Sequence, residues 1–312
     1  MLRTPFDCPN ELKTRSCPIC TAPHCVDQGP ILHPTPSMVA GIPIDLMGLT
    51  FRLLRCDSCY FQFKNPALPE GKIQECYAKS RDDHWGTSDT GSEREFHVLS
   101  ELLEQHTPSR TILDIGCNNG AFLMTLGEQW KRFGVEPSKE AAAIASSRNI
   151  EVVAATLFDL TPSGRRFDAI TAVDVLEHLA EPLPFLIRAK ELLQPQGVLL
   201  VQTGDSAALP WRLQGSRHWY CSLPEHVSFF CERTLDLIAL QLGMRRLDYR
   251  RIRHRRTDLS QRLTETAKNL GYVLGNRLNG FGVTKWQAAF VNRRAPVWLS
   301  ARDHMVYLFQ NT

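Results

Sequence analysis

The sequence has no long apolar run and little excess charge. None of its 312 residues lies in an uninterrupted apolar stretch of roughly 18 residues, the length that a membrane-spanning helix needs. The first residues, MLRTPFDCPNELKTRSC, contain no apolar core typical of a secretory signal peptide. A net charge of +3 is too small to indicate a nucleic-acid or membrane partner. The sequence therefore predicts a cytoplasmic protein that does not span a membrane.

The composition is ordinary, and repeats are missing. Apolar residues make up 43% of the chain and charged residues 22%, as is typical of a soluble globular protein. The chain has no internal repeat and no low-complexity tract, which argues against a solenoid or a disordered polymer. Its 312 residues are enough for one large domain or two modest ones.

Cysteine, in contrast, is abundant, and its spacing is informative. The ten cysteines include two matched pairs, Cys17-Pro-Ile-Cys20 and Cys56-Asp-Ser-Cys59. A C-x-x-C pair on a tight turn directs two thiolates at one point, and two such pairs complete a tetrahedral zinc site. Because cysteine would fill all four positions, we expect this zinc to hold structure rather than to catalyse.

Other interpretations of the cysteines explain less. A disulfide framework fits poorly with a cytoplasmic chain, and buried free thiols do not explain two matched pairs. Cys8, His24 and Cys25 are candidates to replace an assigned ligand. The remaining cysteines show no partner spacing and are expected to be packing residues: Cys76, Cys117, Cys221 and Cys231.

Strand and helix signals alternate from residue 111 onward. The expected strands cover residues 111–115, 132–135, 152–155, 167–173 and 198–202. The expected helices cover residues 96–105, 121–129, 139–148 and 183–193. Such alternation predicts an α/β fold with a doubly wound parallel sheet and helices on both faces.

The segment TILDIGCNNGAFL, residues 111–123, predicts a buried strand that turns tightly into a helix. Gly116 and Gly120 flank Asn118, where a dinucleotide turn would place a glycine to approach a pyrophosphate. S-Adenosylmethionine has no pyrophosphate, so a protein turn that binds it tolerates asparagine at this position. The charged amino acid end of this ligand suits an acid such as Asp114. Glu136, directly after the second strand, can accept hydrogen bonds from both hydroxyls of a ribose.

Four motifs resemble those of class I S-adenosylmethionine-dependent methyltransferases, in that family's order: LDIGCNNGAFL, GVEPS, FDAITAVDVLEHL and GVLLVQTG. The resemblance runs from about residue 100 to residue 250 and resumes at residues 303–309, which look like the family's last, antiparallel strand. It implies a Rossmann-like fold with a mostly parallel seven-stranded sheet. The cysteine segment resembles the zinc-binding segment that precedes this domain in a bacterial subgroup acting on sugars and other natural products.

This resemblance divides the chain into four parts. They are a zinc-ribbon-like module (residues 1–70), a helical linker (71–107), a methyltransferase domain (108–256 with 300–312) and a helical insertion (257–299). The insertion is expected to cover the pocket as a lid, with the surface of a homodimer as the alternative.

The resemblance also implies which residues bind the cofactor, S-adenosylmethionine. They lie at the ends of the first four expected strands or directly after them: Asp114, Gly116, Cys117, Asn118, Gly120, Glu136, Pro137, Thr156, Leu157, Phe158, Asp174 and Val175. At the adenine ring, three possibilities stay open. Phe158 packs on the ring, backbone groups bind it, or Asp159 reaches its amino group.

The loop after the fifth strand offers candidate catalytic residues. His226 lies there, and the ordinary pKa of histidine suits a general base near neutral pH. The alternative is that Glu225 and His226 cap the next helix or order the loop. His178 is a further candidate, with a structural bridge between its helix and the cofactor loop as the alternative.

A metal-assisted arrangement combines some of these residues. Asp174, Glu177, His178 and His226 could share one divalent ion that activates an acceptor hydroxyl. A similar acid-x-x-Glu-His cluster is used by ubiquinone-pathway O-methyltransferases and small-RNA 2′-O-methyltransferases. The same D-V-L-E-H-L run occurs in relatives without a metal, so the sequence leaves the choice open.

The acceptor is the least defined part. Trp211, Trp219 and Tyr220, interleaved with basic residues, suit a sugar ring, an aromatic ring or an anionic acceptor such as a nucleotide-linked sugar, or form a small core beneath the loop. The arginine-rich residues 245–256 tempt a nucleic-acid interpretation, but they also fit a strand with one solvated face. We therefore predict O-methylation of a sugar or secondary metabolite. The alternatives are sugar C-methylation, nucleic-acid methylation and a non-catalytic binding protein.

Overall fold

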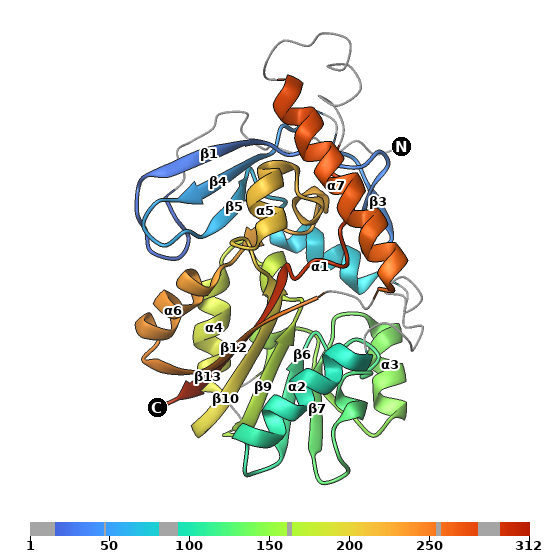
Figure 1. Cartoon of the computed structure of the whole chain (residues 1–312). Helices are drawn as coiled ribbons and strands as arrows, with labels where there is room; N and C mark the ends of the chain where they lie inside the picture. Colours follow the sequence, from blue (N-terminus) through green and yellow to red (C-terminus); the bar gives the residue numbers. More distant parts are fainter. Residues whose placement is uncertain (1–15, 47, 81–92, 161–163, 254–256, 280–293) are drawn as a thin grey trace.

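The computed structural model describes residues 16–46, 48–80, 93–160, 164–253, 257–279 and 294–312. Cys8 and part of the expected insertion, residues 280–293, lie outside the described residues. A large sheet flanked by helices occupies one half of the molecule, and a smaller sheet lies beyond one of its ends (Figure 1).

The larger sheet has seven strands, in the order β8-β7-β6-β9-β10-β13-β12. Their bounds are β6 Thr111–Ile115, β7 Lys131–Val135, β8 Glu151–Ala154, β9 Phe167–Val173, β10 Leu193–Gly204, β12 Met244–Ile252 and β13 His304–Asn311. The strands from β10 to β8 pair in parallel, and β13 runs antiparallel to both of its neighbours. The predicted doubly wound, mostly parallel seven-stranded sheet is confirmed.

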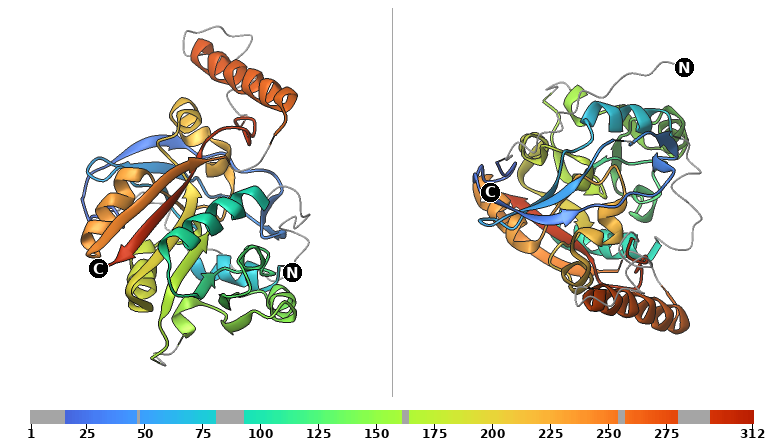
Figure 2. Two further views of the ribbon diagram at one scale, coloured as in Figure 1. Left: turned by 60° about the horizontal axis from the view of Figure 1, so that its bottom comes forward. Right: turned by 90° about the horizontal axis from the view of Figure 1, so that it is seen from above.

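Each face of the sheet buries alternate residues of the same strands, because successive strand side chains point to opposite faces. In β10, Val198 and Leu200 belong to one apolar core, and Leu199 and Val201 belong to the other. Helices cover both faces (Figures 1 and 2). The first core includes residues of α2 (Glu93–His106) and α3 (Lys139–Ser147), and the second includes residues of α4 (Pro182–Glu191) and α6 (Glu232–Gln241).

The smaller sheet has four strands, in the order β1-β4-β5-β11. Three come from the N-terminal segment (residues 16–80), and the fourth follows β10: β1 Cys25–Pro30, β4 Arg52–Cys56, β5 Gln62–Asn65 and β11 Ser228–Phe229. The hairpin β2 (Ser37–Val39) and β3 (Ile42–Ile44) and the helix α1 (Glu70–Ala78) complete this part of the chain. The two-residue β11 gives no strand signal in the sequence, so its pairing with β5 was not predicted.

The helix predicted over residues 121–129 is wrong. The structure has only a short 3₁₀ turn, η2 (Leu123–Thr125), in this span. Leu126 is extended and joins the same apolar core as α2. Gly127 follows, and glycine destabilises a helix by about 1 kcal/mol relative to alanine. Packing of Leu126 therefore overrides the local helical pattern.

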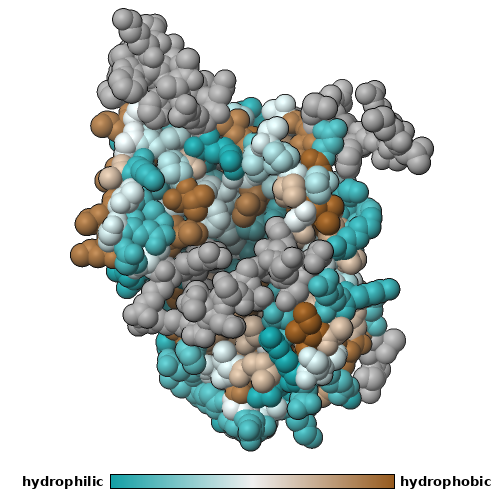
Figure 3. All heavy atoms as spheres, turned by 90° about the vertical axis from the view of Figure 1, so that its right-hand side faces the viewer, coloured by the Kyte–Doolittle hydropathy of each residue, from teal (hydrophilic) through white to brown (hydrophobic). Residues whose placement is uncertain are grey.

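The helix α7 (Leu259–Asn279) fills most of the described insertion and packs beside α5 (Leu209–Gln214). Gln214 donates a hydrogen bond of 2.6 Å to the side-chain oxygen of Asn269. Exposed leucines lie at positions 259, 263, 270 and 274 of α7. Figure 3 views the molecule from the side of α7 and α3, where apolar and polar side chains are mixed. The lid and the dimer surface both stay predictions for this helix.

None of the helices in the described ranges is both long and apolar enough to cross a membrane.

Candidate active site

The turn after β6 is built from left-handed backbone conformations. Gly116, Asn118 and Gly120 have φ angles of 76°, 49° and 81°. Asparagine is one of the few side chains that adopt this conformation readily, which explains why Asn118 can stand between two glycines. A Cβ atom on Gly120 would lie 2.1 Å from Cδ1 of Ile150, so the turn has no room for a side chain there.

Glu136 closes this turn from the next strand. One of its carboxylate oxygens accepts a 2.9 Å hydrogen bond from the backbone N–H of Asn118, and the other accepts 2.8 Å from that of Ser138. Burial raises the pKa of Glu136, and these two hydrogen bonds oppose the rise. Each oxygen keeps a second lone pair for a ligand hydroxyl. The carboxylate is thus held in place before a ligand arrives.

Two further carboxylates stand at or after the carboxyl ends of neighbouring strands. Asp114 is buried in β6 and accepts a 2.6 Å hydrogen bond from the hydroxyl of Thr171, and burial raises its pKa to about 7. Asp174 follows β9 with a φ angle of 52°. Within the described part of the chain its buried Oδ1 has no hydrogen-bond partner, and burial raises its pKa to about 7. A strained residue with an unpartnered polar atom points to a ligand.

The remaining predicted cofactor residues surround this turn less tightly. The side chain of Val175 faces Gly116, whose Cβ would lie 3.0 Å from it, and Cys117 packs against Gly134. Thr156 precedes the 3₁₀ helix η3 (Leu157–Asp159) and donates 2.8 Å from its hydroxyl to Asp159. Pro137, Leu157 and Phe158 lie after β7 and β8, and the side chain of Phe158 is 55% exposed.

A separate group of donors lies beside the carboxyl ends of β9 and β10. Glu177, His178 and His226 each offer one ligand atom, and these three atoms lie within 4.8 Å of one another. Glu177 and His178 belong to the 3₁₀ helix η4 (Leu176–His178), and His226 precedes β11. Asp174, which the sequence placed in the same group, is not among the three.

The three side chains are oriented by their own partners. Glu177 is fully buried and accepts hydrogen bonds from Thr203 (2.8 Å) and from the Tyr220 hydroxyl (2.5 Å). The Nδ1 atom of His226 lies 3.2 Å from the carbonyl oxygen of Tyr220. A carbonyl only accepts, so Nδ1 carries the proton and Nε2 keeps its lone pair.

The second imidazole is held in a similar way. Nδ1 of His178 lies 3.4 Å from the carbonyl oxygen of Glu225 and 3.1 Å from the Tyr77 hydroxyl. Burial and the neighbouring His178 keep the pKa of His226 well below its usual range, so its ring is neutral near pH 7. Imidazoles whose Nδ1 is directed at a carbonyl oxygen are typical metal ligands.

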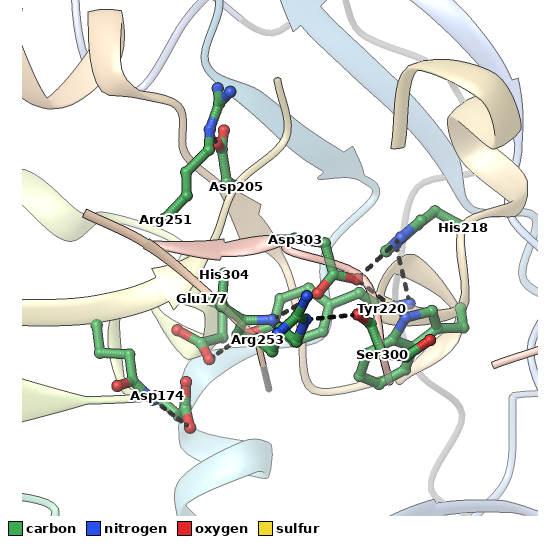
Figure 4. A network of polar contacts seen from close by, with 12 residues as sticks. Asp174, Glu177, Asp205, His218, Tyr220, Arg251, Arg253, Ser300, Asp303 and His304 are labelled. Atoms are coloured by element: carbon green, nitrogen blue, oxygen red, sulfur yellow. Dashed lines mark hydrogen bonds and ion pairs between the residues drawn. The ribbon is translucent and has the colours of Figure 1, made fainter. Parts of the chain in front are cut away.

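One polar network at this site was missed from the sequence. Asp303 is buried and lies 2.9 Å from Nδ1 of His304 and 3.4 Å from Nε2 of His218 (Figure 4). The His304 ring stands edge-on to Tyr220 at a centroid distance of 5.1 Å. The sequence contained Asp303 and His304 only as the start of the last strand, without a signal that they would meet the Glu177 side of the site.

The predicted acceptor-loop residues are mostly buried. Trp211, Trp219 and Tyr220 belong to an apolar core beneath the loop, which is the second of the two interpretations that the sequence allowed. The arginines of β12 have local partners: Arg246 pairs with Glu232 and Asp236, and Arg251 pairs with Asp205.

The four paired cysteines converge as their spacing predicted. The sulfurs of Cys17 and Cys59 are 3.5 Å apart, those of Cys20 and Cys56 are 3.4 Å apart, and all four lie within 4.8 Å of one another. Tetrahedral zinc with Zn–S bonds of about 2.3 Å requires S···S separations of about 3.8 Å. A disulfide would need about 2.05 Å, so the observed separations are closer to those of a tetrahedral metal site than to a covalent bond.

Both cysteine turns have the same backbone geometry. Thr21 and Tyr60, the residues after each pair, have φ angles of 57° and 64°. Their N–H groups donate to the carbonyl oxygens of Cys17 (2.9 Å) and Cys56 (3.0 Å). Two matching turns that face each other fit one tetrahedral ion. Cys25 lies in β1 opposite Cys56 and outside this group of four.

Comparison with known proteins places the chain in a family. A family model described as a methyltransferase domain matches residues 91–247. The ubiquinone biosynthesis O-methyltransferase of Azorhizobium caulinodans is 30% identical over 128 residues, which cover 35% of this chain and 51% of that protein. The protein of the same name from Cereibacter sphaeroides is 34% identical over 135 residues, which cover 35% of this chain and 52% of that protein. The chain thus spans about half the length of these curated relatives.

A solved structure agrees with the fold. The complex between the Haloferax volcanii Trm112 methyltransferase activator and a methyltransferase contains a chain that matches with a TM-score of 0.51. That match has 15% sequence identity and covers 76% of this chain and 96% of that chain, so it bears on the fold alone. Together with the matched residues 91–247 and the strand order of the sheet, it leads to one conclusion: the chain belongs to the methyltransferase domain family of S-adenosylmethionine-dependent enzymes, with the class I fold.

Proposed function

We propose that the protein transfers a methyl group from S-adenosylmethionine to a hydroxyl group of a small molecule, and that Glu177, His178 and His226 hold a divalent ion for this reaction. The observation that carries the proposal is the convergence of these three ligand atoms within 4.8 Å. The names of the curated relatives, which are O-methyltransferases, support oxygen as the accepting atom.

The cofactor would lie against the turn of residues 116–120. The fit is supported by the fixed carboxylate of Glu136 and by the buried, unpartnered side-chain oxygens of Asn118 and Asp174 within the described part of the chain. Asp114 offers a carboxylate near the same edge, where an ammonium group would favour its charged form. S-Adenosylmethionine supplies an activated methyl group, so the protein's task is to place the acceptor in line with it.

The donor set of the second group fits a divalent ion. Two imidazoles and a carboxylate suit zinc, manganese or iron. When bound, such an ion would lower the pKa of an acceptor hydroxyl. Thr203 and Tyr220 orient Glu177, and main-chain carbonyls orient both imidazoles, as the supporting partners of metal ligands commonly do.

Burial makes His226 a weak general base. An efficient base has a pKa near the working pH, whereas burial lowers the pKa of His226 well below its usual value. The role of metal ligand needs only the neutral ring that this low pKa provides. We therefore prefer the metal-assisted arrangement to proton removal by His226 or Glu225.

The acceptor class follows from this choice. Two neighbouring oxygens can bind one ion together, which fixes the orientation of the hydroxyl that is methylated. We propose an acceptor with vicinal hydroxyls, as in sugars, nucleotide-linked sugars and catechols. The loop tryptophans are buried, so stacking on them contributes nothing to this choice.

We also propose that the four-cysteine cluster holds a structural zinc ion. Reduced thiolates of this kind are typical of a reducing compartment, which agrees with a cytoplasmic location.

The test is transfer of a labelled methyl group from S-adenosylmethionine to a panel of catechols, hexoses and nucleotide-linked sugars, with Mg²⁺, Mn²⁺ or Zn²⁺ added or removed. We expect methylation of an oxygen that stops when the divalent ion is chelated and resumes when it is restored. Transfer that is indifferent to chelation would exclude the metal-assisted reaction. Transfer only to nitrogen or carbon acceptors would exclude the proposed chemistry altogether.

A further inference from the structure

The loop that carries His226 is attached to the N-terminal segment. Ser228 and Phe229 of β11 pair with Phe63 and Gln62 of β5. The N–H of Lys64 continues this pairing with a 2.9 Å hydrogen bond to the carbonyl oxygen of Val227. Because β11 has only two residues, its extended conformation depends on a partner strand. That partner is β5, which comes from the segment that also carries the cysteine cluster.

Lys64 makes a second connection through its side chain. The residue is fully buried, and its ammonium group lies 2.5 Å from the carbonyl oxygen of Leu223 and 3.5 Å from that of Pro224. Among the described residues no carboxylate forms an ion pair with this ammonium group, so its burial is unfavourable. Burial lowers the pKa of Lys64 to about 7, although the charge of Glu225 opposes this shift. A hydrophobic side chain would pack at this position without that cost. The costly ammonium group is therefore positioned specifically on the Leu223–Pro224 turn.

Two other residues of the same segment touch the site. Nδ1 of His33 lies 2.9 Å from the carbonyl oxygen of Ser222, at the start of the loop. The hydroxyl of Tyr77, at the end of α1, lies 3.1 Å from Nδ1 of His178. Thus contacts from three separate places in the N-terminal segment end on the loop or on a residue of the Glu177–His178–His226 group.

The other side of the loop is tied to η4. The N–H of Val227 donates 2.7 Å to the carbonyl oxygen of Glu177, and the hydroxyl of Ser228 donates 2.5 Å to that of Leu179. The loop consequently lies between β5 on one side and the segment with Glu177 and His178 on the other. A loss of the β5 contacts would leave His226 attached to only one of its two supports.

We propose that Lys64 is a positioning residue for the methyl-transfer site: with β5, it holds the loop of residues 222–227 so that His226 meets Glu177 and His178. The proposal rests on the function proposed for these three residues. It makes the N-terminal segment one wall of the site rather than a separate module, and it implies that the cysteine cluster acts on the site through β4 and β5.

The test compares Lys64→Met with Lys72→Met in the full-length protein. Lys72 is a partly exposed lysine of α1 that pairs with Glu75, so its replacement controls for loss of a positive charge. In Lys64→Met we expect the amides of residues 222–229 to exchange hydrogen about tenfold faster or more, since local opening is controlled by such contacts. We expect the affinity for Mn²⁺ to fall about tenfold to a hundredfold, the usual loss when support of a ligand is removed.

S-Adenosylhomocysteine affinity should stay within about twofold in both lysine variants, because Glu136 and the glycine turn do not contact Lys64. Unchanged exchange and unchanged Mn²⁺ affinity in Lys64→Met would overturn the proposal. If Lys64→Met does not fold, His33→Ala serves instead, since it removes one contact to the loop from a partly exposed side chain. If the wild type binds no Mn²⁺, the metal-assisted function is refuted. Faster hydrogen exchange in Lys64→Met would in that case still support the role of Lys64 in holding the loop.

Discussion

Replacing Glu177 with glutamine is expected to lower the rate of methyl transfer by about a hundredfold or more, because a bound metal ion contributes several kcal/mol to stabilising the reacting oxygen. Glutamine keeps the size of the side chain but loses the charge that an ion needs. The two hydroxyls that now donate to Glu177 can rotate to suit the amide, so the fold should be retained.

The measurement is the rate of labelled methyl transfer, made together with an S-adenosylhomocysteine titration and a thermal melt. Cofactor affinity should be unchanged, because Glu177 lies outside the glycine turn. Glu191→Gln is the matched control, since that carboxylate is exposed and pairs with Arg188 of the same helix. A Glu177→Gln protein with wild-type transfer and the same dependence on divalent ions would contradict the ligand role.

Replacing Cys20 with serine should remove the proposed structural zinc and unfold the N-terminal segment. Structural zinc contributes about 10–16 kcal/mol in small zinc modules, which is as large as the whole stability of a typical domain. Cys20 is the only partly exposed member of the four, so a serine hydroxyl there adds little desolvation cost of its own. We expect metal analysis to show loss of about one zinc per chain and calorimetry to show a new transition at low temperature.

Cys231→Ser provides the control for this experiment. Cys231 precedes α6 at the N-cap position, where serine is a preferred residue. The Cys231→Ser protein should contain as much zinc as the wild type, and its melting temperature should be the same or higher. If Cys20→Ser keeps its zinc and melts like Cys231→Ser, the cluster is not a structural metal site.

Much of the fold was predictable because its signals are local. The strands β6 and β9 were predicted with the bounds that the structure shows, since apolar residues run through both. The glycine turn and Glu136 were predicted from their spacing after two strands, and the structure joins them by a hydrogen bond. The convergence of Cys17, Cys20, Cys56 and Cys59 also followed from sequence spacing.

The unpredicted features depend on contacts between distant residues. Lys64 donates a hydrogen bond to a carbonyl oxygen 159 positions further along the chain, and a lysine inside a strand gives no sign of such a partner.

The site also contains residues that sheet order brings together. Asp303 and His304 meet His218 and Tyr220 because β13 is inserted between β10 and β12. Asp174 is not among the three converging ligand atoms, which spacing along the sequence does not reveal.

The measurement to make first is a calorimetric titration of the wild type, Glu136→Ala and Glu140→Ala with S-adenosylhomocysteine. Glu140 is an exposed acid on α3 and serves as the matched control. We predict micromolar binding by the wild type and Glu140→Ala, and binding weaker by about thirtyfold or more in Glu136→Ala, since hydrogen bonds to a charged group contribute about 1.5–3 kcal/mol. No binding by folded wild-type protein, or equal binding by all three, would contradict the assignment of the glycine turn and Glu136 to the methyl donor.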